Sequence, residues 1–239
     1  DISDFDLSGL DKLENEKKGW GQGVQVDSRN RPISCDSYQT KYGQYGAVFI
    51  MPDTSKTMYL TFDDGPSKNT EAILKILNDK GIQATFFVVG KNAAEHPDRV
   101  KAIAAQGSLV ANHTQTHDTS VIYQDEESCL KAFDDGRDTI ASILGSDYPN
   151  DLVRFPYGST NRDYRDAVKN AGYRFFDWNA LNGDAESGAS KRTSDDLYQE
   201  LKNTVDKQYK KGNDIIVLMH DTNSKTNTVK MLPDAIDYI

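Results

Sequence analysis

The fold class of this chain is indicated most clearly by residues 58–89, MYLTFDDGPSKNTEAILKILNDKGIQATFFVV. Its first part, residues 58–62, predicts a strand that ends in a polar turn. Apolar side chains then recur at a helical spacing within residues 70–80, and Gly81 follows as a helix stop. Residues 84–89 form a mainly apolar run of strand length. The stretch therefore predicts a strand–helix–strand unit whose strands pair in parallel through a right-handed crossover.

The same alternation continues along the chain. Further strands are predicted at residues 109–111, 152–155, 173–178 and 215–219. Further helices are predicted at residues 98–106, 126–144, 163–170 and 195–209, and the last residues again look helical. Short apolar runs without alternation are typical of strands that are covered on both faces. An open α/β sheet and a barrel both fit this pattern, and in either fold the chemistry belongs just past the carboxyl ends of the strands.

The beginning of the chain differs from the rest. Residues 1–55 are rich in Gly, Asp, Ser, Gln and Tyr, and their apolar residues are weakly periodic. One apolar run, residues 47–51, predicts a short additional strand. We expect residues 1–55 to form an N-terminal arm or small cap, with a linker as the alternative, and residues 56–239 to form the main domain.

Composition disfavours several classes of function. The formal net charge is -9, so the basic footprint of a nucleic-acid-binding protein is absent, and charge does not favour binding to an anionic membrane. No apolar run is long enough to span a bilayer. Cys35 and Cys129 could pair or remain thiols, because two cysteines do not define a disulfide framework. A signal or membrane anchor would lie outside the sequence if both ends are boundaries within a longer protein.

Reactive side chains gather just after the predicted strands. The segments concerned are residues 61–67 with Asp63 and Asp64, residues 113–117 with two histidines, residues 154–158, Asp184, and residues 218–220. Two histidines four residues apart can converge on one metal ion from a single helical turn, and a carboxylate from another strand end can complete a set of three. Three protein ligands leave room for water and substrate, which is typical of a catalytic metal site.

These segments resemble, in the same order, the five motifs of the polysaccharide deacetylases, also called carbohydrate esterase family 4 or the NodB-homology domain. The resemblance covers about residues 56–239, and the first two motifs are the most specific. It implies a distorted (β/α) barrel, to which the N-terminal arm expected from composition would be attached. It also implies one divalent metal ion, usually Zn²⁺ with Co²⁺ or Ni²⁺ as alternatives, and hydrolysis of acetyl groups on sugar polymers.

The resemblance implies a metal site with a general base beside it. Asp64, His113 and His117 match the metal ligands of the family. The metal would lower the pKa of a water molecule and polarise the acetyl carbonyl. Asp63 matches the general base, which must stay off the metal to accept the proton of that water. Arg154 matches the residue that holds the base, and its charge is expected to lower the pKa of Asp63.

The remaining matched positions would complete the hydrolysis. The backbone N–H of Tyr157 would help to stabilise the oxyanion. His220 would be the general acid that protonates the departing sugar amine, and Asp184 would orient it and favour its imidazolium form. Leu218 would line the pocket for the acetyl methyl group. From the residues alone, Leu218 is also a good core residue and Tyr157 a good turn residue.

The fourth motif departs from the family pattern. The family often shows Asp-x-x-Asp-Trp, whereas residues 181–185 are LNGDA. Ala185 therefore stands where a tryptophan wall of the sugar groove would be, and Trp178 lies seven residues earlier. We expect Ala185 to line the cleft beside the metal and the groove to discriminate poorly between glycans, unless Trp178 fills the same wall.

The resemblance implies a secreted or cell-surface enzyme that removes acetyl groups from N-acetylglucosamine in cell-wall peptidoglycan. Deacetylation of chitin or chitooligosaccharides and acetylxylan esterase activity need the same catalytic residues and stay open. So does deacetylation of N-acetylmuramic acid, because residues 19–21 (Gly-Trp-Gly) are faintly similar to such enzymes. A non-catalytic glycan-binding domain is disfavoured by the presence of the base and all metal ligands. The expected partner is an acetylated polysaccharide, with no nucleic acid and no protein partner implied.

Overall fold

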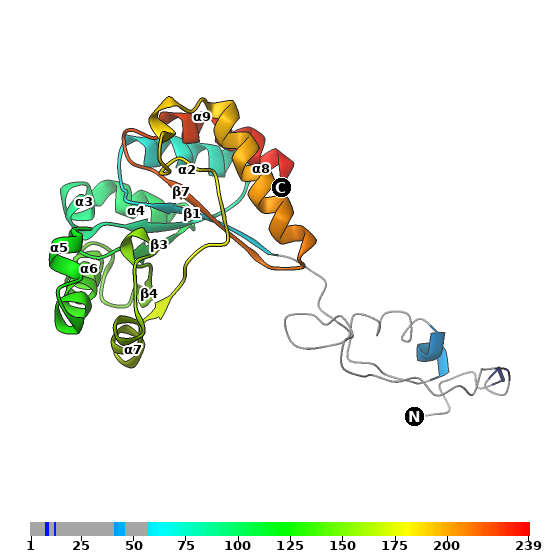
Figure 1. Cartoon of the computed structure of the whole chain (residues 1–239), viewed down its shortest axis with the longest axis horizontal. Coiled ribbons are helices and arrows are strands. Elements are labelled where there is room, and N and C mark those ends of the chain that lie inside the picture. The colour runs from blue at the N-terminus through cyan, green and yellow to red at the C-terminus, as the bar shows by residue number, and fades with distance from the viewer. Residues whose placement is uncertain (1–7, 10–11, 13–40, 46–56) are drawn as a thin grey trace. The chain divides into compact units, whose positions relative to one another are not determined.

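The computed structural model describes residues 8–9, 12, 41–45 and 57–239 (Figure 1). The chain divides into two compact units, residues 1–57 with 211–213 and residues 58–210 with 214–239. In the first unit, the described residues include a short 3-10 helix, η3 (Gly43–Tyr45). The strand predicted at residues 47–51 lies outside the described residues, and so do Cys35 and most of the predicted arm. Those predictions therefore stay predictions.

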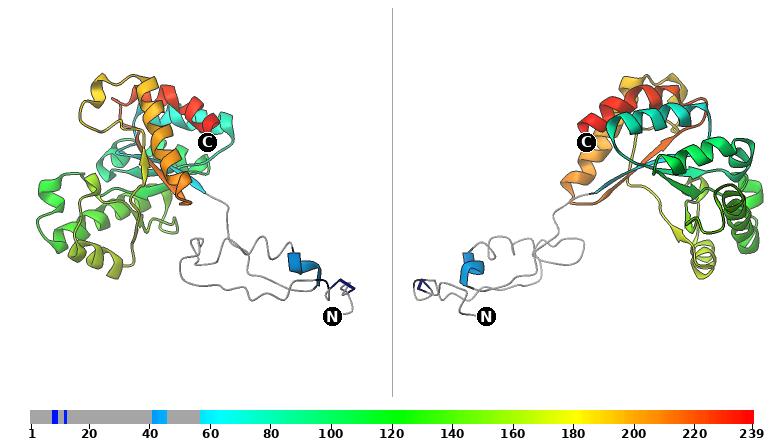
Figure 2. Two further views of the ribbon diagram at one scale, coloured as in Figure 1. Left: turned by 45° about the vertical axis from the view of Figure 1, so that its right-hand side comes forward. Right: turned by 180° about the vertical axis from the view of Figure 1, so that it is seen from behind.

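A seven-stranded parallel sheet forms the centre of the second unit. The strands lie in the order β5-β4-β3-β2-β1-β7-β6 and curl into a half-barrel with the helices outside (Figures 1 and 2). Their bounds are β1 Met58–Asp63, β2 Thr85–Val88, β3 Leu109–Asn112, β4 Leu152–Val153, β5 Arg174–Phe175, β6 Ala180–Leu181 and β7 Ile215–His220. This arrangement confirms the predicted distorted (β/α) barrel.

The helices pack outside the sheet as the crossovers require. Their bounds are α2 Lys68–Lys80, α3 Gly90–Glu95, α4 Pro97–Ala105, α5 Thr119–Ile122, α6 Glu126–Leu144, α7 Arg162–Asn170, α8 Ser194–Lys210 and α9 Thr226–Tyr238, with 3-10 turns η4 Pro156–Gly158 and η5 Ala189–Lys191. The predicted helices α2, α4, α6, α7 and α8 are confirmed to within two residues. The predictions missed α3, α5 and β6, which are too short for a periodic pattern to show. None of the helices in the described residues is long and apolar enough to cross a bilayer.

Helix α2 shows why the first crossover forms where it does. The Ser67 hydroxyl oxygen accepts the Asn69 N–H at 3.0 Å, and the Thr70 hydroxyl oxygen accepts the Ser67 N–H at 2.7 Å. This capping box starts the helix two residues before the first predicted one. Gly81 ends it in a left-handed conformation (φ 66°), which glycine adopts without a steric cost.

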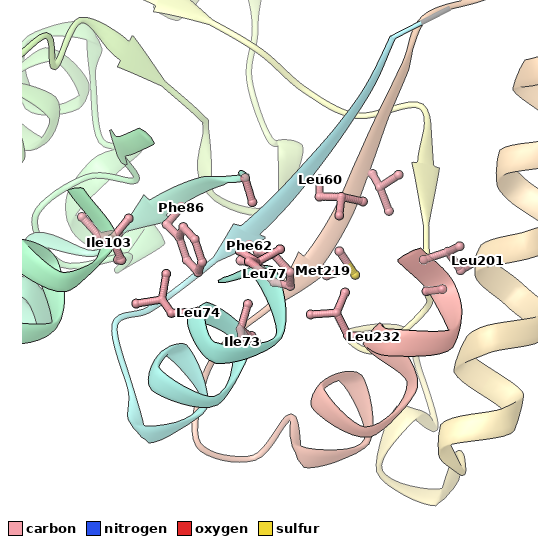
Figure 3. Packing of buried hydrophobic residues seen from close by; sticks show 14 of the residues in the cluster. Leu60, Phe62, Ile73, Leu74, Leu77, Phe86, Ile103, Leu201, Met219 and Leu232 are labelled. Atoms are coloured by element: carbon pink, nitrogen blue, oxygen red, sulfur yellow. The ribbon is translucent and has the colours of Figure 1, made fainter. Parts of the chain in front are cut away.

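The main core lies between the sheet and helices that include α2, α4, α8 and α9. Figure 3 shows Phe62 of β1 and Met219 of β7 facing Leu77 of α2 and Leu232 of α9, and all four side chains are fully buried. A second cluster, under α6 and α7, contains the buried Cys129. Burial of each large apolar side chain stabilises the fold by about 1.5–3 kcal/mol. The apolar residues of the strands are buried in this core, and polar residues lie at the carboxyl ends of the strands.

Candidate active site

The parallel register places the predicted site residues at one edge of the sheet. Asp63, the last residue of β1, is level with His220, the last residue of β7. Asn112, the last residue of β3, is level with Val153 of β4, so the residues that follow each strand emerge at the same edge. A cavity of about 430 Å³ opens there, and every predicted site residue except Arg154 lines it.

Asp64, His113 and His117 form a cluster that could hold a metal ion. Their ligand atoms lie within 4.8 Å of one another. Asp64 Oδ1 is 3.3 Å from His117 Nε2 and 3.5 Å from His113 Nε2. This oxygen is buried, and no described residue donates a hydrogen bond to it. A buried carboxylate oxygen without a partner costs free energy, which a cation between the three groups would offset. The donor set therefore fits one divalent metal ion.

The hydrogen bonding and burial of His113 suit it to ligate a metal ion. Its Nδ1–H donates to the backbone carbonyl of Arg154 at 2.8 Å, so the lone pair on Nε2 faces Asp64. Burial lowers the pKa of His113 to about 3, against the smaller opposing effect of Asp64. The imidazole is therefore neutral at physiological pH, as a metal ligand must be.

The loop after β3 corrects one prediction. The two histidines do not share a helical turn, because residues 113–118 are not helical and both Thr114 (φ 69°) and His117 (φ 57°) are left-handed. The Asn112 side-chain oxygen accepts the Thr114 N–H at 2.9 Å, and the Thr114 hydroxyl oxygen accepts the His117 N–H at 3.2 Å. These bonds fold the loop back, and the two imidazole rings meet with centroids 4.9 Å apart.

Asp63 lies beside this cluster in a buried ion pair. Arg154 is fully buried, and its Nη1 donates to Asp63 Oδ1 at 2.8 Å and to Thr61 Oγ1 at 2.7 Å. The other Asp63 oxygen, Oδ2, is 3.7 Å from His113 Nε2. Burial raises the pKa of Asp63 above its usual value and outweighs Arg154, which lowers it. Arg154 thus lowers the pKa of Asp63 as expected, but desolvation is the larger effect, so the net pKa is raised.

His220 and Asp184 form a second pair, and β7, which ends at His220, lies on the side of β1 that faces away from β2 and β3. The His220 Nδ1–H donates to Asp184 Oδ1 at 2.7 Å, and the His220 backbone N–H donates to Asp184 Oδ2 at 3.0 Å. The Thr228 hydroxyl also donates to Asp184 Oδ2, at 2.7 Å. Burial lowers the pKa of His220, but the hydrogen bond and charge of Asp184 raise it by more, so the pKa lies above its usual value. The pair therefore favours the imidazolium form.

The cavity walls combine predicted and unpredicted residues. Tyr157 is 68% exposed and its ring lies 4.7 Å from that of His117. Ala185 lines the cavity as predicted, but Trp178 lines it too, so the cavity keeps an aromatic side chain. Leu218 is a buried strand residue that also lines the cavity, so it is both a core residue and a cavity residue.

The sequence interpretation missed two contributors. Glu186 lines the cavity and pairs with Arg192 at 3.1 Å. No sequence signal marked it. Thr61 receives the Arg154 hydrogen bond, and its position two residues before Asp63 in a strand could have shown that both side chains lie on the same face.

Comparison with known families agrees with this geometry. Residues 51–176 match the family model for polysaccharide deacetylase. The chain belongs to the polysaccharide deacetylase family.

Its relatives include enzymes named for two different glycans. The chain is 40% identical over 126 residues to the peptidoglycan-N-acetylglucosamine deacetylase of Bacillus cereus, over 52% of this chain and 45% of that protein. It is 38% identical over 124 residues to a chitooligosaccharide deacetylase of Rhizobium leguminosarum, over 52% and 56%. The crystal structure of the polysaccharide deacetylase Bc1974 from Bacillus cereus covers 77% of this chain and 86% of its own, with a TM-score of 0.66 and 32% identity. The chain spans about half the length of these curated relatives.

Proposed function

We propose that this protein is a metal-dependent hydrolase that removes acetyl groups from N-acetylglucosamine units of cell-wall peptidoglycan. The observation that carries the chemistry is the cluster of Asp64, His113 and His117 around a buried carboxylate oxygen without a hydrogen-bond partner. The identity with the Bacillus cereus peptidoglycan enzyme supports the substrate. Because peptidoglycan lies outside the cytoplasmic membrane, the proposal includes a secreted or cell-surface location.

The ligand set favours Zn²⁺. Two imidazole nitrogens and one carboxylate oxygen form a borderline donor set of the kind found in catalytic zinc sites, and Co²⁺ or Ni²⁺ are the alternatives. The ion would lower the pKa of a water molecule and polarise the acetyl carbonyl.

Asp63 is the proposed general base. Arg154 holds its Oδ1, so its Oδ2 is the oxygen available to accept a proton from the attacking water. Burial of this carboxylate raises its pKa, which makes it a stronger base than an exposed aspartate. The backbone N–H of Tyr157 is proposed to donate to the oxyanion, and Leu218 to contact the acetyl methyl group.

His220 is the proposed general acid. Its Nδ1–H is held by Asp184, so its Nε2–H is the proton to be donated to the leaving sugar amine. Its Nε2 lies 4.0 Å from Asp64 Oδ2, and the proposed base oxygen, Asp63 Oδ2, lies 3.7 Å from His113 Nε2, which supports an acid and a base that are both close to the proposed metal ligands. The acid and the base thus flank the point at which the acetyl group would bind.

Acetate release from a glycan panel tests the proposal. We expect the protein loaded with Zn²⁺ to release acetate from peptidoglycan faster than from chitooligosaccharides or acetylxylan. A chelator should abolish release, and added Zn²⁺ should restore it. Faster release from chitooligosaccharides would favour the second candidate, to which the Rhizobium relative points. A protein that binds metal and glycan but releases no acetate would be a glycan-binding domain instead.

A further inference from the structure

Asp221 is a fully buried carboxylate directly after the proposed general acid. It lies against the end of β1, which carries Asp63, and against the turn that follows with Asp64 and Gly65. A Cβ atom placed on Gly65 of that turn would collide with the Asp221 carboxylate, to which its three nearest heavy atoms would all belong. The carboxylate therefore occupies the space that a side chain at position 65 would need.

Three hydrogen bonds tie Asp221 to this turn. Its backbone N–H donates to the Asp63 carbonyl at 3.2 Å. Its backbone carbonyl accepts the Ser67 hydroxyl, and its Oδ2 accepts the Thr70 hydroxyl. Ser67 and Thr70 are the two residues of the capping box that starts α2. A single residue thus connects the end of β7 with the whole turn between β1 and α2.

Burying the Asp221 carboxylate costs free energy, and this indicates that the residue does more than stabilise the fold. The second carboxylate oxygen, Oδ1, is buried and receives no hydrogen bond from a described residue. Burial raises the pKa of Asp221 to about 7, which expresses the same desolvation cost. A residue selected for stability alone would avoid that cost, and local costs of this kind concentrate at functional sites.

We propose that Asp221 is a positioning residue that fixes the end of β1, with Asp63, and the turn after it, with Asp64, relative to His220. By fixing Asp64 it would hold a proposed metal ligand, and by fixing Asp63 it would set the distance between the proposed base and the proposed acid. The second of these effects, on the distance between base and acid, rests on the proposed function. The first effect concerns metal binding alone and can be tested without a substrate.

The first experiment compares Asp221→Ala with Asp221→Asn by calorimetric titration of Zn²⁺ and by acetate release. Loss of a residue that orients a metal ligand typically weakens metal affinity about 10–100-fold, and we expect this for Asp221→Ala. We also expect kcat to fall about 100-fold with little change in KM, because catalytic groups tolerate little misplacement. Asp221→Asn keeps an acceptor for Thr70 and should restore most of both quantities.

Ser108→Ala is the matched control. Ser108 is also buried, and its hydroxyl oxygen accepts the Ala84 N–H at 3.0 Å at the start of β3, away from the cavity. We expect it to lower stability without changing Zn²⁺ affinity or kcat. If Asp221→Ala lowers stability alone, as the control does, the proposal is overturned.

Gly65→Ala provides an independent test that leaves the carboxylate in the chain. In the wild-type background its Cβ would displace Asp221, so Zn²⁺ affinity and kcat should both fall. In the Asp221→Ala background the same substitution should add little, because the atoms that it would meet are gone. Additive losses, or a Gly65→Ala variant with unchanged Zn²⁺ affinity, would overturn the proposal. A wild-type protein without activity would instead overturn the proposed function, while the Zn²⁺ titrations would still decide the role of Asp221.

Discussion

Asp63 and Asp64 are adjacent in the chain but face different partners. Asp63 ends β1 in extended backbone and pairs with Arg154, whereas Asp64 adopts a left-handed conformation (φ 74°) and faces the two histidines. Such a conformation costs an aspartate roughly 1–3 kcal/mol. It is held by a hydrogen bond from the Asn92 side chain to the Asp64 carbonyl at 2.8 Å. This backbone change at one residue separates the proposed base from the proposed ligand.

Exchanging the two carboxylates for amides should therefore have different effects. We expect Asp63→Asn to retain Zn²⁺ but to lower kcat about a hundredfold or more, because general-base catalysis contributes that much. We expect Asp64→Asn to lose Zn²⁺, as His117→Ala should. Metal analysis of the purified variants, together with kcat, measures both effects. Loss of Zn²⁺ from Asp63→Asn rather than Asp64→Asn would show that the roles are reversed.

The His220–Asp184 pair predicts the alkaline limb of the pH profile. The pKa of His220 is raised, so the imidazolium persists to higher pH than usual, and activity that needs it is lost as pH rises through that pKa. Asp184→Asn removes the carboxylate charge and should move the alkaline limb of kcat to lower pH by about one unit or more. The acid limb, assigned to Asp63, should stay in place. An alkaline limb that does not move would exclude His220 as the general acid.

At the scale of elements, the connections after the strands decide which side chains meet. The loop after β3 brings His113 and His117 together through two left-handed residues rather than a helical turn. The connection between β5 and β6 places Trp178 on the cavity wall, and its ring lies against Gly158 of η4. The segment after β6 adds Ala185 and Glu186 to the cavity. The walls thus come from short connections, which vary more readily than strands.

The side chains that line the cavity should affect glycan binding more than they affect metal binding or kcat. We expect Trp178→Ala to raise KM for peptidoglycan about 5–10-fold, the equivalent of roughly one aromatic contact, with Zn²⁺ occupancy unchanged. Trp178→Phe keeps a ring and serves as the control. Ala185→Trp should alter KM or chain-length preference more than kcat. If Trp178→Ala leaves KM unchanged while Ala185→Trp lowers it, the missing tryptophan at position 185 is the wall that matters.

At the scale of the whole molecule, the proposed metal site joins segments that are distant in sequence. Asp64 follows β1, while His113 and His117 follow β3, and these strands are separated by β2 in the sheet. A metal bound there would cross-link the turn after β1 to the loop after β3. It would bind the folded chain and not the unfolded one, so its binding free energy would add to the free energy of unfolding.

Chelation should therefore lower the melting temperature. At Zn²⁺ concentrations 100 times the Kd the stabilisation is about 2.7 kcal/mol, which corresponds to roughly 5–10 °C for a domain of this size. Calorimetry with and without a chelator measures the shift. The His117→Ala variant, which lacks a proposed ligand, should show a much smaller one. If the melting temperature of the wild-type protein does not change when the chelator is added, the proposed metal site is contradicted.

Most of the secondary structure could be predicted because it depends on local patterns. Helix α6 was predicted with its observed bounds, since its apolar period and its Gly145 stop are both local signals. Strands β4 and β5 were predicted too long, because an apolar run does not show where ladder pairing ends. The candidate site residues came from motifs that resemble those of a known family, and all of them except Arg154 line one cavity. Glu186 also lines it but was not among them, since nothing in its neighbourhood marks it.

Local sequence patterns were enough to predict the alternation of strands and helices, and with it the edge of the sheet at which polar side chains would meet. Parallel pairing makes that outcome general, because all strands then end on the same side. The left-handed conformations of Asp64 and His117, the net raised pKa of Asp63 and the packing of Asp221 against Gly65 became visible only in the folded chain. Each of these depends on burial and on contacts between segments far apart in the chain, which no local pattern encodes.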